Sequence, residues 1–219
     1  SDDIELYDEV DLIKKMTRDL KKSSSSLKKP EVRFLVDAYY RMQEKRIQYA
    51  SQIRTMKEFG EPHELLTWFY TQAHTLEKQI AGALDAYSTS NKVGQWMRSI
   101  PGIGPVIAAG FMAHLDIAPW RCHNVGLKGK KNLPCTAEKG ACTDNCGHEP
   151  INYAGQWHTF AGMNPRIQWE KKTRRPWNTA LKTLCYKLGE SFVKVQNHKD
   201  DFYGQIFVAR KSQEWERNF

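Results

Sequence analysis

Long hydrophobic runs are absent from this chain. No stretch of its 219 residues reaches the roughly 18 consecutive apolar residues that a membrane-spanning helix needs. The sequence also begins with the polar run Ser1-Asp-Asp-Ile-Glu5, which lacks the basic and apolar regions of a secretory signal peptide. These two absences predict a soluble intracellular protein.

The common nucleotide-binding signatures are missing as well. Gly102 and Gly104 form a Gly-x-Gly pair, but no strand-like run precedes it and no Gly-Lys-Ser/Thr follows it, which argues against dinucleotide or NTP binding. The spacing instead predicts a tight turn with accessible backbone amides, between a helix over 92–99 and an apolar helix over 106–115 that Pro105 begins. Such a helix, hairpin and helix can hold one DNA phosphate. The alternative is a glycine turn that only lets two helices pack.

An excess of acidic charge is missing too. Lys and Arg total 33 against 25 Asp and Glu, which gives a formal net charge of +8 and a pI near 9.2. Between Arg121 and Lys211 there are 16 basic and 7 acidic side chains, which leaves 17 against 18 in the rest of the chain. The positive excess therefore lies downstream of the glycine pair, which favours a polyanionic partner such as DNA.

Helical periodicity, in contrast, is abundant. Apolar residues recur at intervals of three and four residues in several long segments, which predicts a mainly α fold. The predicted helices cover 4–22, 30–58, 63–88, 177–196 and 202–216. The four serines at 23–26 predict a flexible linker after the first helix, which serves either as an arm for a partner or as a surface helix folded back on the body.

The helices over 30–58 and 63–88 are joined by the short turn Gly60-Glu-Pro62, so we predict a long antiparallel hairpin of coiled-coil type. Such a hairpin buries only one stripe on itself, so it either packs on the following domain or pairs with another copy. We favour a homodimer or homotetramer built on 30–88. The predicted organisation is an N-terminal amphipathic arm with a Ser-rich linker (1–29), an oligomerisation hairpin (30–90), and a helix-hairpin-helix DNA-binding domain (91–219) with a Cys-rich insertion (119–153).

Four of the five cysteines fall in that insertion, which is rich in Gly, Lys, Asn and Pro and has no amphipathic period. A loop of this length in a compact domain needs a constraint, and four thiolates can hold a structural Zn²⁺ tetrahedrally in a reducing compartment. A disulfide or free thiols are the alternatives, and Cys185 is expected to be a small core residue. The predicted zinc ligands are Cys122, Cys135, Cys142 and Cys146, with His148 and His123 as alternates.

Basic side chains alternate with tryptophans between Gly155 and Trp177. Cations suit backbone phosphates and rings suit exposed base faces, so this pattern predicts a groove for distorted or unpaired nucleic acid. Trp157 is expected in the core instead. The predicted DNA-binding residues are Gly102, Ile103, Gly104, Lys128, Lys130, Lys131, Arg166, Trp169, Lys171, Lys172, Arg174 and Arg175.

Several of these blocks occur in the same order in a known family. The run Ser99-Ile-Pro-Gly-Ile-Gly-Pro-Val-Ile-Ala-Ala109 is followed by Phe160-Ala-Gly-Met-Asn-Pro165, by the basic pairs at 171–172 and 174–175, and by Asn178-x2-Leu181. Over roughly residues 30 to 211, this order resembles the C-terminal transposase domain of the DEDD-type insertion-sequence recombinases. Those enzymes join a RuvC-like nuclease domain, through a long coiled coil, to a helix-hairpin-helix domain.

The chain departs from that family at both catalytic parts. Family members carry a nucleophilic Ser-Gly after the Gly-x-x-Pro block, where this chain has Glu170-Lys171, and residues 1–29 are too few for a RuvC-like domain. The resemblance therefore implies a non-catalytic protein that grips branched or distorted duplex DNA in recombination, or in mobile-element or phage DNA processing, in the cytoplasm and nucleoid of a bacterium or a phage-infected host. One alternative is a recombinase or junction nuclease whose catalytic residues come from a partner protein or from a site that includes Glu170, Asp116 or His158. Another alternative is a protein-interaction adaptor.

Overall fold

The computed structural model describes residues 16–61, 63–115, 120–122, 148–150, 154–173 and 175–218. The described residues are predominantly helical, which confirms the prediction of a mainly α fold, and none of their helices is long and apolar enough to cross a membrane. The elements are α2 (Arg18–Ser23), the 3₁₀ helix η1 (Ser24–Ser26), α3 (Lys29–Met56), α4 (Glu64–Thr89), α5 (Lys92–Arg98), α6 (Pro105–His114), β1 (Trp120–Cys122), β2 (His148–Pro150), α7 (Ala154–Phe160), α8 (Thr179–Lys194) and α9 (Phe202–Asn218).

Local signals set where the two longest helices begin. Oε2 of Glu31 accepts a hydrogen bond from the amide of Lys28 at 2.6 Å, in the first turn of α3 where Pro30 also lies. The Nδ1 atom of His63 accepts one from the amide of Leu65 at 3.1 Å and caps α4. Both caps satisfy amides that have no carbonyl partner inside their helices.

The chain divides into two compact units, one made of residues 1–114 and 187–219 and the other of residues 115–186. The division falls within α8, between Tyr186 and Lys187. The sequence predicted a boundary near residue 90 instead. In the compact division, α5 and α6 belong to the same unit as the helices before them.

The core of the first unit is built from three helices. Its buried members are Val32 and Val36 of α3, Ile80 and Leu84 of α4, and Val106, Ala109 and Ala113 of α6. Arg33 adds a polar link, since its Nε and Nη2 atoms donate to the carbonyl oxygen of Ala113 at 2.9 and 2.7 Å. The bases of α3 and α4 therefore pack on the segment that follows them.

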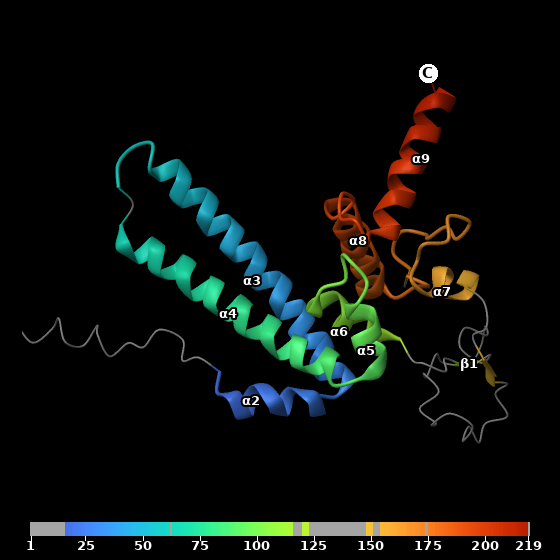
Figure 1. Cartoon of the computed structure of the whole chain (residues 1–219), viewed down its shortest axis with the longest axis horizontal. Coiled ribbons are helices and arrows are strands. Elements are labelled where there is room, and N and C mark those ends of the chain that lie inside the picture. Colours follow the sequence, from blue (N-terminus) through green and yellow to red (C-terminus); the bar gives the residue numbers. More distant parts are fainter. Residues whose placement is uncertain are drawn as a thin grey trace, which may run out of the picture. The chain divides into compact units, whose positions relative to one another are not determined.

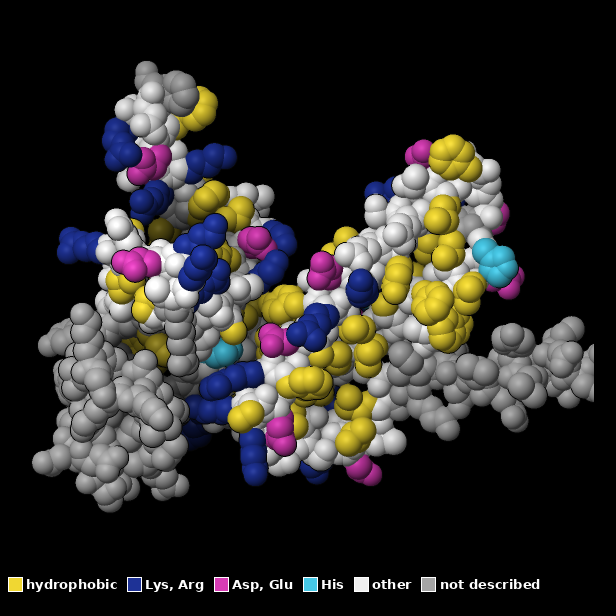
Figure 2. Space-filling model, turned by 180° about the vertical axis from the view of Figure 1, so that it is seen from behind, with side chains coloured by type: hydrophobic (Ala, Val, Ile, Leu, Met, Phe, Trp, Pro, Cys, Tyr) yellow, Lys and Arg dark blue, Asp and Glu magenta, His cyan; other side chains and the backbone are white. Residues whose placement is uncertain are grey.

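Away from that base, α3 and α4 continue side by side as an arm (Figure 1). One ion pair crosses it, with Nε of Arg46 2.5 Å from Oε2 of the buried Glu77. Many apolar side chains remain exposed along the arm, where Figure 2 shows yellow side chains at the surface. They are Ile47, Met56, Phe59, Leu65, Trp68 and Phe69.

The N-terminal part of the described chain differs from expectation in two ways. Thr17 has ψ 155°, and its side chain accepts a hydrogen bond from the amide of Leu20, so α2 begins at Arg18. The prediction of one continuous helix over 4–22 is therefore wrong at Thr17. Residues 1–15 lie outside the described chain. The serine run forms the 3₁₀ helix η1 rather than an open linker. Its hydroxyl groups donate to carbonyls three or four residues earlier, and Ser24 is buried.

Candidate nucleic-acid interface

The hairpin between α5 and α6 is a tight turn around Gly102. The amide of Ile103 donates to the carbonyl of Ile100 at 3.0 Å, and Gly102 has φ +90°. With Pro101 at the second position, these are the features of a type II turn, whose third residue needs a positive φ. Glycine is required here because other residues rarely adopt that conformation.

One side of this turn is covered by packing. A Cβ atom at Gly102 would lie 2.8 Å from Cδ1 of Phe192 and 3.2 Å from Cγ2 of Val195. The hydroxyl of Ser191 donates to the carbonyl of Gly102 at 2.6 Å. The packing alternative therefore accounts for Gly102, whose backbone is held by the C-terminal half of α8.

The other glycine has a different environment. A Cβ atom at Gly104 would have no neighbour within 4 Å, so its backbone faces open space. Gly104 directly precedes α6, whose first turn contains no acidic residue and whose first amides lack helical carbonyl partners. Of the predicted hairpin residues, Gly104 is thus the one with open space beside it, while the side chain of Ile103 is buried.

Arg98 stabilises the hairpin from the preceding helix, a role that sequence reasoning missed. Its Nη1 atom donates to the carbonyl of Ile103 at 3.3 Å, and its Nη2 atom donates to Oδ1 of Asp85 on α4 at 2.9 Å. A basic residue in the last turn before the glycine pair was the available signal. Since this cation is already paired with a carboxylate, it contributes little free charge to the surface.

In the second unit, the block Phe160-Ala-Gly-Met-Asn-Pro165 ends α7. The amide of Gly162 donates to the carbonyl of Thr159 at 3.0 Å and that of Met163 to His158 at 2.7 Å, and Gly162 has φ +68°. This pair of hydrogen bonds is a Schellman cap, which needs a left-handed residue at this position. A Cβ atom at Gly162 would lie only 2.5 Å from Cγ of Trp177.

Trp177 and Asn178 complete that arrangement. Lys182 places its Nζ atom 4.8 Å from the centre of the Trp177 ring. The amide of Asn178 donates to the carbonyl of Phe160 at 2.9 Å, and its Oδ1 accepts from the amide of Leu181 at 3.0 Å at the start of α8. Gly162, Trp177 and Asn178 therefore have structural roles in joining α7 to α8.

Between these two helices lies a folded turn of residues 166–173 and 175, which we call the basic turn. Nε1 of Trp169 donates to the carbonyl of Thr173 at 2.9 Å, and the guanidinium of Arg175 lies 5.1 Å from the Trp169 ring centre. The hydroxyl of Thr173 donates to the carbonyl of Glu170 at 2.7 Å. Lys172 has φ +75°, a conformation that costs about 1 to 2 kcal/mol for a residue with a Cβ atom.

The basic turn contains four of the predicted DNA-binding cations, and all four are exposed. These are Arg166, Lys171, Lys172 and Arg175. Glu170 is the single acidic residue between 166 and 175. Arg174 was also predicted to bind DNA but lies outside the described residues. Because exposed cations outnumber the carboxylate, the turn carries a local positive charge.

The structure describes only the backbone of two predicted zinc ligands. Strands β1 and β2 pair antiparallel, and Cys122 is directly opposite His148 in their register. Directly opposite residues of antiparallel strands lie about 4.5 to 5.5 Å apart at Cα. No group of three or more candidate metal ligands occurs among the described side chains. The remaining predicted ligands, Cys135, Cys142, Cys146 and His123, lie outside the described residues, as do Lys128, Lys130, Lys131 and Lys139.

The residues considered for catalysis do not form a described cluster. Glu170 is exposed in the basic turn and His158 lies on α7, while Asp116 lies outside the described residues. Cys185 is half-buried, and burial raises the pKa of its thiol, which disfavours the reactive thiolate. It fits the predicted packing role.

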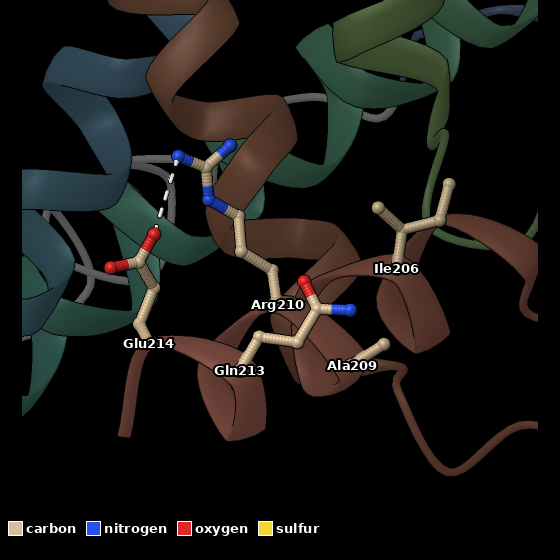
Figure 3. A pocket seen from close by; sticks show the side chains of 5 residues that line it. All are labelled: Ile206, Ala209, Arg210, Gln213 and Glu214. Carbon is tan, nitrogen blue, oxygen red and sulfur yellow. Dashed lines mark ion pairs between the residues drawn. The ribbon is translucent and has the colours of Figure 1, made fainter. Parts of the chain in front are cut away.

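A shallow pocket on α9 offers no alternative active site (Figure 3). All of its lining side chains come from this one helix, and its two charged groups face each other, with Nη2 of Arg210 3.9 Å from Oε1 of Glu214. The lining residues are Ile206, Ala209, Arg210, Gln213 and Glu214. An exposed i, i+4 ion pair on one helix is a common surface feature.

Comparison with known proteins adds no further constraint. No protein-family model matches the chain, and no match is found among curated proteins or solved structures. The likeness to the insertion-sequence recombinases therefore rests on the residue blocks quoted above.

Proposed function

We propose that this chain is a non-catalytic DNA-binding protein that holds backbone phosphates of branched or distorted duplex DNA. The observation that carries the proposal is the basic turn, where four exposed cations accompany a single carboxylate over 166–175. Lys and Arg on phosphates supply sequence-independent affinity. The internal hydrogen bonds of the turn support this role, because they hold the cations in place before DNA binds.

The glycine hairpin supplies the second proposed contact. Gly104 faces open space beside the N-terminus of α6, where amides and the helix dipole favour a phosphate. Gly102 contributes indirectly, since its packing on Phe192 fixes the turn. The two contacts lie in different compact units, and each is proposed on its own geometry.

Trp169 gives the basic turn its suitability for distorted DNA. Its ring is partly exposed and carries the Arg175 guanidinium beside it. An aromatic ring next to cations can stack on an unpaired base while phosphates are neutralised. This arrangement favours branch points over regular duplex, because bases are unstacked there at lower cost.

A structural zinc ion in the Cys-rich segment is part of the proposal. The β1–β2 register places Cys122 opposite His148, which supports His148 as a ligand together with Cys122. Zn²⁺ accepts such mixed Cys and His sets, and it would tie together a segment that has few other constraints. Metal analysis of protein that has been mildly chelated to remove loosely bound metal checks this proposal. The proposal predicts that about one Zn²⁺ per chain remains bound.

Self-association through 30–88 is likewise proposed rather than observed. Exposed Ile47, Met56 and Phe59 on α3 and in the following turn support it. The net charge of the arm also permits it, since residues 44–64 contain four basic and four acidic side chains. A dimer or tetramer would hold several duplex arms together.

The decisive experiment is binding to a labelled four-way junction, linear duplex and single strand, each with and without Mg²⁺. The double variant Lys171→Ala/Lys172→Ala removes two cations of the basic turn. Each phosphate contact contributes about 0.9 to the slope of log K against log salt. If the variant loses two contacts and binds like the parent at 1 M salt, it should bind about 60-fold more weakly than the parent at 0.1 M salt. The control Lys45→Ala/Lys78→Ala removes the same charge from exposed positions on α3 and α4.

The expected result is a smaller salt slope for the basic-turn variant and an unchanged slope for the control. Equal losses in both would show that only net charge matters, and absence of binding to all three DNAs at moderate salt would refute the function. Mg²⁺-dependent cleavage of the junction would contradict a non-catalytic role and favour the nuclease alternative.

A protein-interaction adaptor is the second candidate. It is favoured by the apolar side chains that α9 leaves exposed, since Gly204 is its one buried residue. A helix of this length gains most of its stability from packing. The exposed large apolar residues of α9 are Phe202, Tyr203, Ile206, Phe207, Val208 and Trp215. Binding of a protein without binding of any DNA would support this candidate.

A further inference from the structure

One stripe of α4 is only partly covered by the rest of the described chain. Its members are spaced by three and four residues, so they lie along one side of the helix. The stripe consists of Leu65, Trp68, Gln72, Thr75, Gln79 and Gly82.

The C-terminal end of this stripe is occupied by the start of the described chain. The amide of Met16 donates to Oε1 of Gln79 at 3.0 Å. A Cβ atom at Gly82 would lie 3.6 Å from Cε of Lys21, and α2 lies beside this part of α4 (Figure 1). Residue numbers rise together in these two contacts, so α2 runs parallel to α4. Met16, the first described residue, therefore lies at the end of α2 that is nearer the N-terminal end of the stripe.

That N-terminal end is apolar and open. The exposed fractions are 54% for Leu65, 40% for Trp68 and 43% for the adjacent Phe69. Contiguous exposed apolar side chains of this size mark a contact surface more often than free surface.

We propose that residues 4–13 of this same chain dock on the Leu65, Trp68 and Phe69 surface. The segment has the required apolar side chains, Ile4, Leu6, Val10 and Ile13. It also has the reach, because the 14 residues from Gln79 back to Leu65 rise about 21 Å, whereas twelve residues span about 18 Å as a helix and about 40 Å when extended.

Two considerations favour this occupant over a second copy. Residues 1–13 contain six acidic and no basic side chains, so two copies meeting on this surface would bring two strongly negative segments together. The segment is also tethered at Met16, beside the stripe, and a short tether gives an effective concentration in the millimolar range.

The test places a photo-reactive p-benzoyl-phenylalanine at Trp68 in the full chain. Equal amounts of ¹⁵N-labelled and unlabelled protein are mixed, irradiated and mapped by mass spectrometry. The expected cross-links join position 68 to residues 4–13 within one isotopic species. The same probe at His74, about 120° around the helix from Trp68, should not link to this segment.

Paired variants connect the cross-link to apolar docking. Leu6→Asp/Val10→Asp should lower its yield several-fold, whereas Lys14→Gln/Lys15→Gln, which changes the net charge by the same two units, should not. Far-UV circular dichroism checks that both variants remain helical. Cross-links of mixed isotopic composition, links only to other segments, or no link at all would each overturn the proposal.

Discussion

The two hairpin glycines provide a matched pair of substitutions that separates packing from phosphate access. Gly102→Ala adds a methyl group where φ is +90° and where Phe192 and Val195 lie 2.8 and 3.2 Å away. Gly104→Ala adds the same group where no atom lies within 4 Å. Both changes are chemically identical and two residues apart, so composition and charge are controlled.

The expected costs follow from these two environments. At Gly102, the left-handed conformation costs about 1 to 2 kcal/mol, and forcing a methyl group into packed side chains costs about 1 to 3 kcal/mol more. The two costs together are about 2 to 5 kcal/mol, centred near 3.5 kcal/mol. At Gly104, a surface substitution changes the free energy of unfolding by about 0.5 kcal/mol or less.

Urea unfolding followed by far-UV circular dichroism measures the difference. With a urea m-value of about 2 kcal/mol/M, a loss of about 3.5 kcal/mol lowers the unfolding midpoint by about 1.8 M. Gly102→Ala should show this shift, and Gly104→Ala should unfold near the parent midpoint. Junction affinity should fall more in Gly104→Ala than in Gly102→Ala, because a methyl group at Gly104 obstructs the backbone that a phosphate would approach.

Equal midpoints for the two variants would refute the conclusion that α8 packing fixes Gly102. If Gly104→Ala bound the junction as tightly as the parent at every salt concentration, Gly104 would not be a phosphate contact. A midpoint shift confined to Gly104→Ala would contradict the geometry of the hairpin altogether.

Two further predictions concern the interior of the first unit. Arg46→Met should lower the free energy of unfolding in urea by about 3 kcal/mol, because it leaves the buried Glu77 carboxylate without its cation. The double variant Arg46→Met/Glu77→Met should recover most of this loss. Equal losses of unfolding free energy in the single and double variants would contradict the reasoning. Burial, with a smaller contribution from the Arg33 charge, lowers the pKa of His114. The unfolded chain therefore takes up this proton first as pH falls below about 6.5, so stability should decline there, and His114→Gln should flatten the pH dependence of the urea midpoint; an unchanged slope would rule out this contribution.

Most helices could be predicted from the sequence because their signals are local. The helix expected over 30–58 is observed as Lys29–Met56, and that over 63–88 as Glu64–Thr89. Apolar spacing and the capping residues Glu31 and His63 lie within a few positions of the turns they specify. The mainly α class follows from these short-range patterns alone.

The candidate site was predictable in part for the same reason. Exposed cations and a glycine pair can be recognised from residue type and spacing, and the structure does expose Lys171, Lys172 and Arg175. Spacing could not show that Nε1 of Trp169 closes the basic turn on Thr173. The side-chain geometry of the predicted zinc ligands stays a prediction, since it lies outside the described side chains.

Long-range packing decided what spacing could not. Two glycines two residues apart look equivalent in the sequence, yet Gly102 is held by Ser191 and Phe192, about 90 positions away, while Gly104 faces open space. Val106 and Ala113 likewise share a core with Val32, which belongs to a much earlier helix. Local sequence thus determined the helices and the charge of this protein, and tertiary contacts decided which glycine is packed against α8 and which one faces open space.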